Sequence, residues 1–184
     1  KATHLMIVKP DGTIIKGPEN LNFPNGSVIT EDGKNLIVGE TLGGRLTSFD
    51  ITEEGLLENR KVWAATGSRL LLYFIKFLRK IGITFTESTG SSKFYVPDGI
   101  CMDENDGIWV ASPTSSSVIR IEKGGRITDE IKTPKNAYAC MLGGLDKKTL
   151  YIMVAESSDA TICRESPKGE IYSTEVSFAG SGKP

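Results

Sequence analysis

Histidine and cysteine are scarce in this sequence of 184 residues, and their scarcity narrows the chemistry that the chain can carry. The only histidine is His4, so a Ser-His-Asp triad would have to use it; it lies in an expected outer hairpin, where we predict a surface residue. No C-x-x-C pair occurs among Cys101, Cys140 and Cys163, which are predicted to be buried free thiols. An odd number of thiols favours a reducing compartment, so we expect a cytoplasmic protein.

The sequence also lacks an excess of charge of either sign. Lys and Arg together number 22, Asp and Glu together number 23, and the net charge is −1. Such a chain has no overall field that would attract nucleic acid or an acidic membrane. We therefore expect no nucleic-acid partner.

Long uncharged apolar runs are absent as well. The most apolar stretch, "GSRLLLYFIKFLRKIGITF" at residues 67–85, is too short and too charged to span a bilayer. The spacing of its polar residues predicts an amphipathic helix over residues 69–81. We expect this helix to pack on the rest of the protein or on a partner subunit; docking at a membrane surface and a gene-model error are the alternative interpretations.

Glycine and short alternating apolar stretches are abundant instead. The 20 glycines recur beside Asp, Asn and Lys, which is typical of tight turns between strands. Because the turns are short, the strands are predicted to form antiparallel sheets. Apolar residues at every second position predict strands at residues 3–8, 27–30, 35–40, 45–51, 60–65, 99–102, 107–112, 117–122 and 149–155.

One hairpin pattern occurs twice in the chain, as "FPNGSVITEDGKNLIVGE" at residues 23–40 and "VPDGICMDENDGIWVAS" at residues 96–112. Each copy has a proline, an Asn or Asp, a glycine, an apolar strand, an acidic glycine turn and a second apolar strand. Pro134 opens a third unit 37 residues after Pro97, close to the roughly 40 residues of a propeller blade. The repeat predicts an all-β fold of antiparallel four-stranded blades.

We expect a single partial β-propeller domain over residues 1–184, with an insertion at about residues 67–95. A hairpin at residues 3–16 would be the outer half of an earlier blade. About three and a half blades of this shape cannot close a ring, because unpaired edges and a bare apolar face would remain. The three complete units are predicted at residues 25–66, 97–133 and 134–176.

The repeated polar position marks the candidate site. In a propeller the first residues of each innermost strand converge on the central channel, so Asn25 and Asp98 are predicted to point at one shared place. Hard divalent cations prefer such amide and carboxylate oxygens. Asn-Gly and Asp-Gly are also common turn dipeptides, so a purely structural turn is the alternative interpretation.

Other polar residues fit a structural role better. Glu40, at the end of a strand, could line the channel, but a hydrogen bond with Thr41 or Arg45 is the favoured interpretation over metal ligation. Asn136 falls near the repeated position of the third unit, yet no glycine follows it, so it ranks below Asn25 as a ligand. Cys101 and Cys140 are expected to serve core packing rather than nucleophilic chemistry.

Four motifs in order resemble the senescence marker protein 30, gluconolactonase and luciferin-regenerating enzyme family. They are "NFPNGSVITEDGKNLIVGET", "VPDGICMDENDGIWVASP", "YACMLGGLDKKTLYIMVA" and "GEIYSTEVSFAGSGKP". The resemblance implies blades of a six-bladed propeller that hydrolyses lactones with one divalent metal ion in its channel. It also implies that Asn25 and Asp98 are metal ligands and that Asp98 accepts a proton from the attacking water.

The resemblance covers only the C-terminal half of that family. The family's first metal ligand, a Glu, and the Asn and Arg that contact its substrate would lie before Lys1, so we expect a further part of the propeller upstream. The expected cofactor is Ca²⁺ or Zn²⁺, with Mg²⁺ and Mn²⁺ as alternatives.

Two hypotheses of different classes follow from these observations. The first is a metal-dependent lactone hydrolase, with a small-molecule lactone as its partner. The second is a non-catalytic propeller fragment that acts as a binding or assembly module and self-associates to complete the ring.

Overall fold

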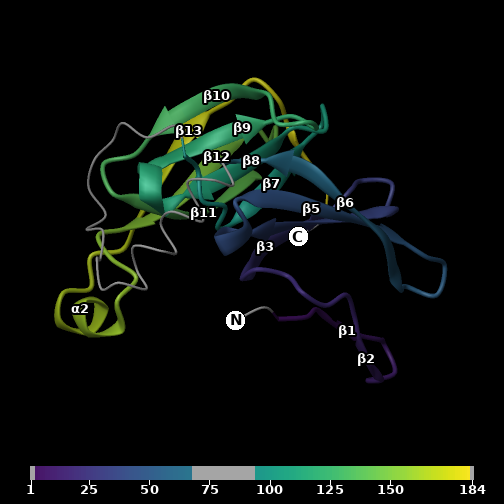
Figure 1. Cartoon of the computed structure of the whole chain (residues 1–184). Helices are drawn as coiled ribbons and strands as arrows, with labels where there is room; N and C mark the ends of the chain where they lie inside the picture. Colours follow the sequence, from purple (N-terminus) through teal and green to yellow (C-terminus); the bar gives the residue numbers. More distant parts are fainter. Residues whose placement is uncertain (1–2, 68–93, 183–184) are drawn as a thin grey trace.

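The structure, a computed structural model, describes residues 3–67 and 94–182. Strands are the main secondary structure of these residues (Figure 1), and they pair antiparallel, which confirms the predicted all-β antiparallel fold. The helix predicted over residues 69–81, and with it most of the predicted insertion, lies outside the described residues. Among the residues that are described, no helix is long and apolar enough to cross a membrane.

The first part of the chain forms a hairpin and a four-stranded sheet. The hairpin pairs β1 (Met6–Val8) with β2 (Ile14–Lys16), where the sequence predicted it. The sheet has the order β3-β4-β5-β6. Its strands are β3 (Pro24–Ile29), β4 (Asn35–Glu40), β5 (Arg45–Ile51) and β6 (Leu57–Ala65).

The second sheet has four consecutive strands and one from the end of the chain. Its order is β10-β9-β8-β7-β14, so the C-terminal segment pairs with the innermost strand. The strands are β7 (Ile100–Asp103), β8 (Ile108–Ser112), β9 (Ser117–Ile121), β10 (Ile127–Lys132) and β14 (Gly180–Ser181).

The third sheet has three strands in the described residues, one fewer than the sequence predicted. It pairs β11 (Asn136–Gly143) with β12 (Thr149–Ala155) and β12 with β13 (Glu170–Glu175). The polar stretch between β12 and β13 instead forms a short helix, α2 (Ala160–Glu165), that the sequence analysis missed. Asp159 caps this helix, because its side chain accepts hydrogen bonds from two backbone N–H groups of the first turn.

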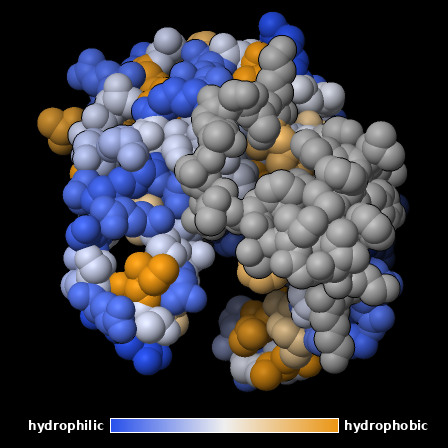
Figure 2. Space-filling model, turned by 60° about the vertical axis from the view of Figure 1, so that its left-hand side comes forward, coloured by the Kyte–Doolittle hydropathy of each residue, from blue (hydrophilic) through white to orange (hydrophobic). Residues whose placement is uncertain are grey.

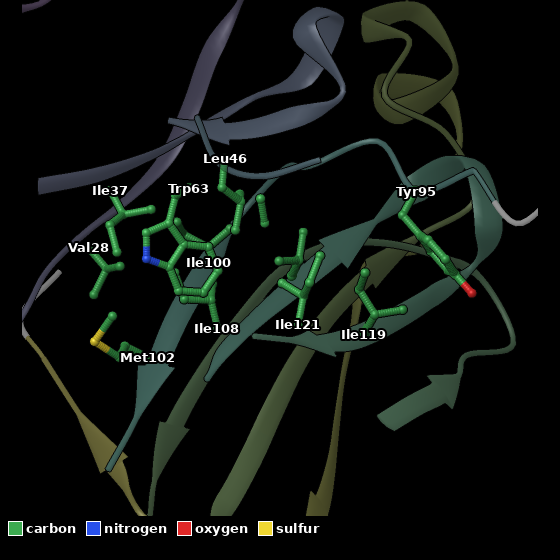
Figure 3. Packing of buried hydrophobic residues seen from close by; sticks show 12 residues of the cluster. Val28, Ile37, Leu46, Trp63, Tyr95, Ile100, Met102, Ile108, Ile119 and Ile121 are labelled. Atoms are coloured by element: carbon green, nitrogen blue, oxygen red, sulfur yellow. The ribbon is translucent and has the colours of Figure 1, made fainter. Parts of the chain in front are cut away.

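The inner strands of the second sheet, β7, β8 and β9, are buried on both faces, because most of their successive residues are apolar. Along β8, Ile108 and Val110 face the first sheet, whereas Trp109 and Ala111 face the third. Figure 3 shows the first of these layers, in which Trp63 of β6 lies among isoleucines of β7, β8 and β9. Such stacking of sheets about a common axis is the way neighbouring propeller blades pack.

The cysteines are all free, but only two of them are buried as predicted. Cys101 and Cys140 meet between the second and third sheets, with 4.0 Å between their sulfur atoms. The neighbouring Cys101 thiol and burial both raise the pKa of Cys140, which fits core packing rather than nucleophilic duty. The prediction is wrong for Cys163, which is exposed because it lies on α2, a helix without buried residues.

Large apolar side chains also reach the surface. On the face in Figure 2, hydrophobic residues form separate patches among hydrophilic ones. Several of the exposed residues belong to the outermost elements of the stack: the β1–β2 hairpin and β13. They are Met6, Val8, Ile14, Ile171 and Tyr172.

Candidate metal centre

Asn25 and Asp98 lie side by side where the innermost strands of the first two sheets begin. Asn25 is the second residue of β3, and Asp98 stands two residues before β7. The two backbones are joined by a hydrogen bond of 3.0 Å from the Gly26 N–H to the Asp98 carbonyl oxygen. A hydrogen bond also joins the Asn25 side chain to the Asp98 carboxylate. The structure therefore brings together the two residues that the sequence singled out.

A local distortion of each strand turns these side chains toward one another. On the first sheet, Pro24 pairs with Glu40 but Ser27 pairs with Val38, so Asn25 and Gly26 together face Gly39. A bulge in which two residues oppose one bends the strand and re-aims a side chain.

The second sheet has the same bulge. The Asp98 N–H donates to the Ala111 carbonyl oxygen, and the Ala111 N–H donates to the Gly99 carbonyl oxygen, both at 3.0 Å. Asp98 and Gly99 therefore oppose the single residue Ala111. The Asn-Gly and Asp-Gly dipeptides mark the same bulge in the two sheets. This shared bulge is the structural reason for the repeated sequence motif.

The glycine of each dipeptide is required by the close approach of the neighbouring sheet. A Cβ atom added at Gly26 would lie 2.5 Å from the Asp98 carbonyl oxygen and 2.6 Å from the Ile100 nitrogen. A Cβ atom at Gly99 would lie 2.7 Å from the Cα atom of Ala139. Both contacts are with backbone, which has little room to move aside.

The third sheet repeats the bulge at a residue that the sequence analysis missed. Along β11, Ala137 pairs with Val154 and Ala139 with Met153, which leaves Tyr138 as the extra residue. The Gly99 N–H donates to the Tyr138 carbonyl oxygen at 2.9 Å, as the Gly26 N–H does to that of Asp98. Asn25, Asp98 and Tyr138 therefore occupy the same position on three successive innermost strands.

Asn136, the residue predicted to fall near this position, lies two residues before it. It is buried, with an exposed fraction of 6%. Its amide group donates to the Glu156 carbonyl oxygen at 3.1 Å and accepts from the Ser116 hydroxyl at 3.1 Å. These contacts tie the third sheet to the loop after β12 and to the second sheet.

The Asp98 carboxyl is held without a positive partner in the described part of the chain. Burial raises its pKa, while hydrogen bonds from the Asn25 side chain and the Gly99 N–H act in the opposite direction. The Thr41 hydroxyl links the segments that carry Asn25 and Asp98. It donates a hydrogen bond to the Pro97 carbonyl oxygen at 2.7 Å and lies 3.4 Å from the Asn25 amide nitrogen. No ion pair to Asp98 is found among residues 3–67 and 94–182.

The donors at this place fit a hard cation. They are an exposed amide and a partly exposed carboxylate, both of which offer oxygen atoms. A nearby divalent charge would offset the effect of burial and keep the Asp98 carboxyl ionised. Within the described residues no group of three or more His, Cys, Asp or Glu side chains could hold a metal ion, and these residues offer one carboxylate and one amide here.

Glu40 has the structural role that the sequence favoured. Its fully buried carboxylate accepts hydrogen bonds from Arg45 at 2.8 Å, Thr47 at 2.5 Å, Arg60 at 3.0 Å and the Asn22 N–H at 2.7 Å. The predicted contact with Arg45 is present, whereas the threonine partner is Thr47 and not Thr41. With every oxygen engaged, Glu40 is a poor ligand for a cation.

The C-terminal segment crosses the opposite ends of the innermost strands. β14 pairs with β7 at Met102 and Asp103, and the Gly180 N–H donates to the Lys147 carbonyl oxygen at 2.8 Å. A Cβ atom at Gly182 would lie 2.8 Å from the Ile29 carbonyl oxygen at the end of β3. The segment therefore holds the three sheets together at the end away from the bulges.

Known sequences resemble this chain over most of its length. The model of the SMP-30/Gluconolactonase/LRE-like region matches residues 1–156. Regucalcin from Gallus gallus is 24% identical over 148 residues, which are 79% of this chain and 42% of the relative. Regucalcin from Xenopus laevis is 26% identical over 154 residues, which are 82% of this chain and 44% of the relative. The chain thus spans less than half the length of these curated relatives.

Solved structures show the same fold. A luciferin-regenerating enzyme superposes with a TM-score of 0.71 at 18% identity, covering 100% of this chain and 55% of that one. The calcium-binding protein regucalcin from Agrobacterium tumefaciens gives a TM-score of 0.66 at 19% identity, covering 94% and 52%. A gluconolactonase from Xanthomonas campestris gives 0.59 at 22% identity, covering 83% and 42%. With a family model that matches most of its residues, this chain belongs to the SMP-30/gluconolactonase/LRE-like family.

Proposed function

We propose that this chain carries part of the active site of a divalent-metal-dependent lactone hydrolase. The observation that carries the proposal is the contact between Asn25 and Asp98, two oxygen-bearing side chains at the same bulge of neighbouring innermost strands. Family membership and the likeness to a gluconolactonase and to a calcium-binding regucalcin support it.

Asn25 and Asp98 would hold the cation through their side-chain oxygens. Ca²⁺ and Zn²⁺ are the ions that we expect, with Mg²⁺ and Mn²⁺ as alternatives, since an all-oxygen site admits each of them. Water, substrate oxygens or groups outside this chain would fill the other coordination positions. When bound, the cation would polarise the lactone carbonyl and stabilise the negative charge that develops on its oxygen.

Asp98 would act as the proton acceptor. Its carboxylate takes a proton from a water molecule as the water oxygen bonds to the carbonyl carbon. The ring carbon–oxygen bond then breaks, and the proton passes to the leaving ring oxygen, so that lactone and water give one hydroxy acid. Asn25 would keep the carboxylate oriented through its amide hydrogen bond.

Removal and replacement of the metal tests this proposal. We expect chelator-treated protein to lose the opening of glucono-δ-lactone, followed as acid release, and Ca²⁺, Zn²⁺, Mn²⁺ or Mg²⁺ to restore it. Restoration by only some of these ions would show which cations the site accepts. Turnover that persists fully in the chelated protein would contradict metal dependence.

The partners of the chain remain predictions from the sequence. A compact lactone is the proposed substrate. Association with a second copy to complete the ring, and membrane contact through residues 69–81, are not part of the proposed function.

A further inference from the structure

The orientation of the Asn25 side chain matters for the proposed site. Only the oxygen of an amide side chain suits a hard cation, because the amide nitrogen carries two hydrogen atoms and acts as a donor. A rotation that exchanged the two atoms would therefore remove Asn25 as a ligand. The neighbours of Asn25 decide this orientation, since each of them can meet only a donor or only an acceptor.

Thr41 is the first of these neighbours, and it can only accept a hydrogen bond from Asn25. Its hydroxyl donates to the carbonyl oxygen of the buried Pro97 at 2.7 Å. This contact uses the single hydrogen of the hydroxyl, and withdrawing it from a shielded carbonyl would cost free energy. The same hydroxyl oxygen lies 3.4 Å from the Asn25 amide nitrogen. An amide oxygen in that place would face an acceptor.

The Asp98 carboxylate requires the same orientation of the amide. It accepts a hydrogen bond from the Asn25 side chain, and an ionised carboxylate has only acceptors to offer. The amide nitrogen of Asn25 thus has two acceptors, Thr41 and Asp98. Among residues 3–67 and 94–182 no hydrogen bond to the Asn25 amide oxygen is present, and the side chain is exposed. The oxygen is therefore the atom left for a ligand.

The backbone around Thr41 holds its hydroxyl in place. Thr41 directly follows β4 and begins a short 3-10 helix, Thr41–Gly43. Its N–H donates to the Phe23 carbonyl oxygen at 3.0 Å, and the Leu42 N–H donates to the Asn22 carbonyl oxygen at 3.2 Å. These bonds tie the start of the helix to the residues just before β3, the strand that carries Asn25.

We propose that Thr41 is a positioning residue, which holds the Asn25 amide with its nitrogen toward Asp98 and its oxygen toward the cation. This inference rests on the proposed metal-dependent hydrolysis and deepens it by assigning the residue that orients one of the two ligands. Thr41 contacts neither the cation nor the substrate in this arrangement. It acts through Asn25, as outer hydrogen-bond partners orient the ligands of metal sites.

Calorimetric titration of two Thr41 variants with Ca²⁺ gives the first test. Because Thr41→Val keeps the size of the side chain and removes the hydroxyl, we expect Kd for Ca²⁺ to rise about tenfold. Thr41→Ser keeps the hydroxyl and should bind Ca²⁺ nearly as tightly as the unaltered protein. The matched control is Thr133→Val, which removes a hydroxyl that donates to the Lys135 carbonyl oxygen at 2.6 Å. An unchanged Kd in Thr41→Val, or an equal rise in Thr133→Val, would overturn the inference.

A double variant separates positioning from a general structural effect. If Thr41 acts through Asn25, Thr41→Val should weaken Ca²⁺ binding no further in a protein that already carries Asn25→Ala. The same loss in both backgrounds would mean that the effect does not pass through Asn25, and it would contradict the proposed role.

NMR of the metal-free protein tests the orienting contact without a cation. The side-chain NH₂ group of Asn25 gives a pair of signals that disappears in Asn25→Ala. We expect Thr41→Val to increase the fast motion of this group, seen as a lower heteronuclear NOE, and Thr133→Val to leave it unchanged. If the protein binds no Ca²⁺ but the group becomes more mobile in Thr41→Val, the proposed metal dependence fails and the orientation of Asn25 by Thr41 stands. If Ca²⁺ binds and neither Kd nor the NH₂ group responds to Thr41→Val, the proposed function stands and the inference about Thr41 is wrong.

Discussion

Asp98→Asn is expected to lower kcat/KM for lactone hydrolysis by about 10³-fold, because one side chain supplies both the proton acceptor and a ligand of the cation. An amide has nearly the shape of a carboxylate, so the contact with Asn25 and the backbone hydrogen bonds of the bulge can persist. The free energy of unfolding should therefore change by less than about 1 kcal/mol. Steady-state kinetics at one fixed metal concentration for both proteins and a denaturant titration measure the two effects.

The control for this variant is Asp129→Asn, which removes a carboxylate from the exposed strand β10. It should leave kcat/KM unchanged. Full activity of Asp98→Asn would remove Asp98 from the mechanism. A loss of activity that accompanies a large loss of stability would instead assign Asp98 to the architecture of the bulge.

Glu40→Ala is expected to destabilise the protein by about 3 kcal/mol, because it removes the centre of a buried network. The fully buried Glu40 carboxylate pairs with Arg45 and Arg60, whose side chains are 18% and 32% exposed. Without it the Thr47 hydroxyl and the Asn22 N–H also lose their acceptor. Denaturant unfolding at neutral pH measures the difference, and Glu53→Ala on an exposed turn is the matched control.

The hydrogen-bond network around Glu40 also makes the free energy of unfolding depend on pH in the acid range. Burial would raise the pKa of Glu40, but hydrogen bonds from Arg45, Thr47 and the Asn22 N–H outweigh it and lower the pKa from 4.5 to about 2. Since the folded pKa is below the unfolded value, the contribution is complete above about pH 4.5 and is lost as the pH falls toward 2. A shift of this size corresponds to about 3 kcal/mol. Glu40→Gln should therefore show a flatter stability profile across this window, and an equally steep profile would contradict the network.

Most strands of this fold could be predicted from their apolar residues, but β10, β11 and β13 were not among the predicted ranges. In β8 and β9 every residue is buried, and the alternation assigns the apolar ones to one of two neighbouring sheets. α2 was missed because its six residues are too few for a helical period and its stability depends on the Asp159 cap. The pairing of β14 with β7 was missed because contacts between distant segments leave no local pattern.

The site was predictable only where the repeat keeps its register. Asn25 and Asp98 each follow a proline directly, so the proline marked them correctly. In the third unit Tyr138 lies four residues after Pro134, and counting forward from the proline led to Asn136 instead. The turn after the strand gives no better count, because Glu31 and Glu104 stand six residues after Asn25 and Asp98, whereas Leu145 stands seven residues after Tyr138.

Calorimetric titration with Ca²⁺ tests the central claim most directly, because it measures cation binding without requiring turnover. The account predicts saturable binding by the protein, weakened about tenfold or more in Asn25→Ala and abolished in Asp98→Asn, with Asp129→Asn unchanged. Zn²⁺ in place of Ca²⁺ should give the same ranking of the variants. Binding that is equally tight in all of these variants, or no binding of either ion by the unaltered protein, would contradict the claim that Asn25 and Asp98 hold the metal.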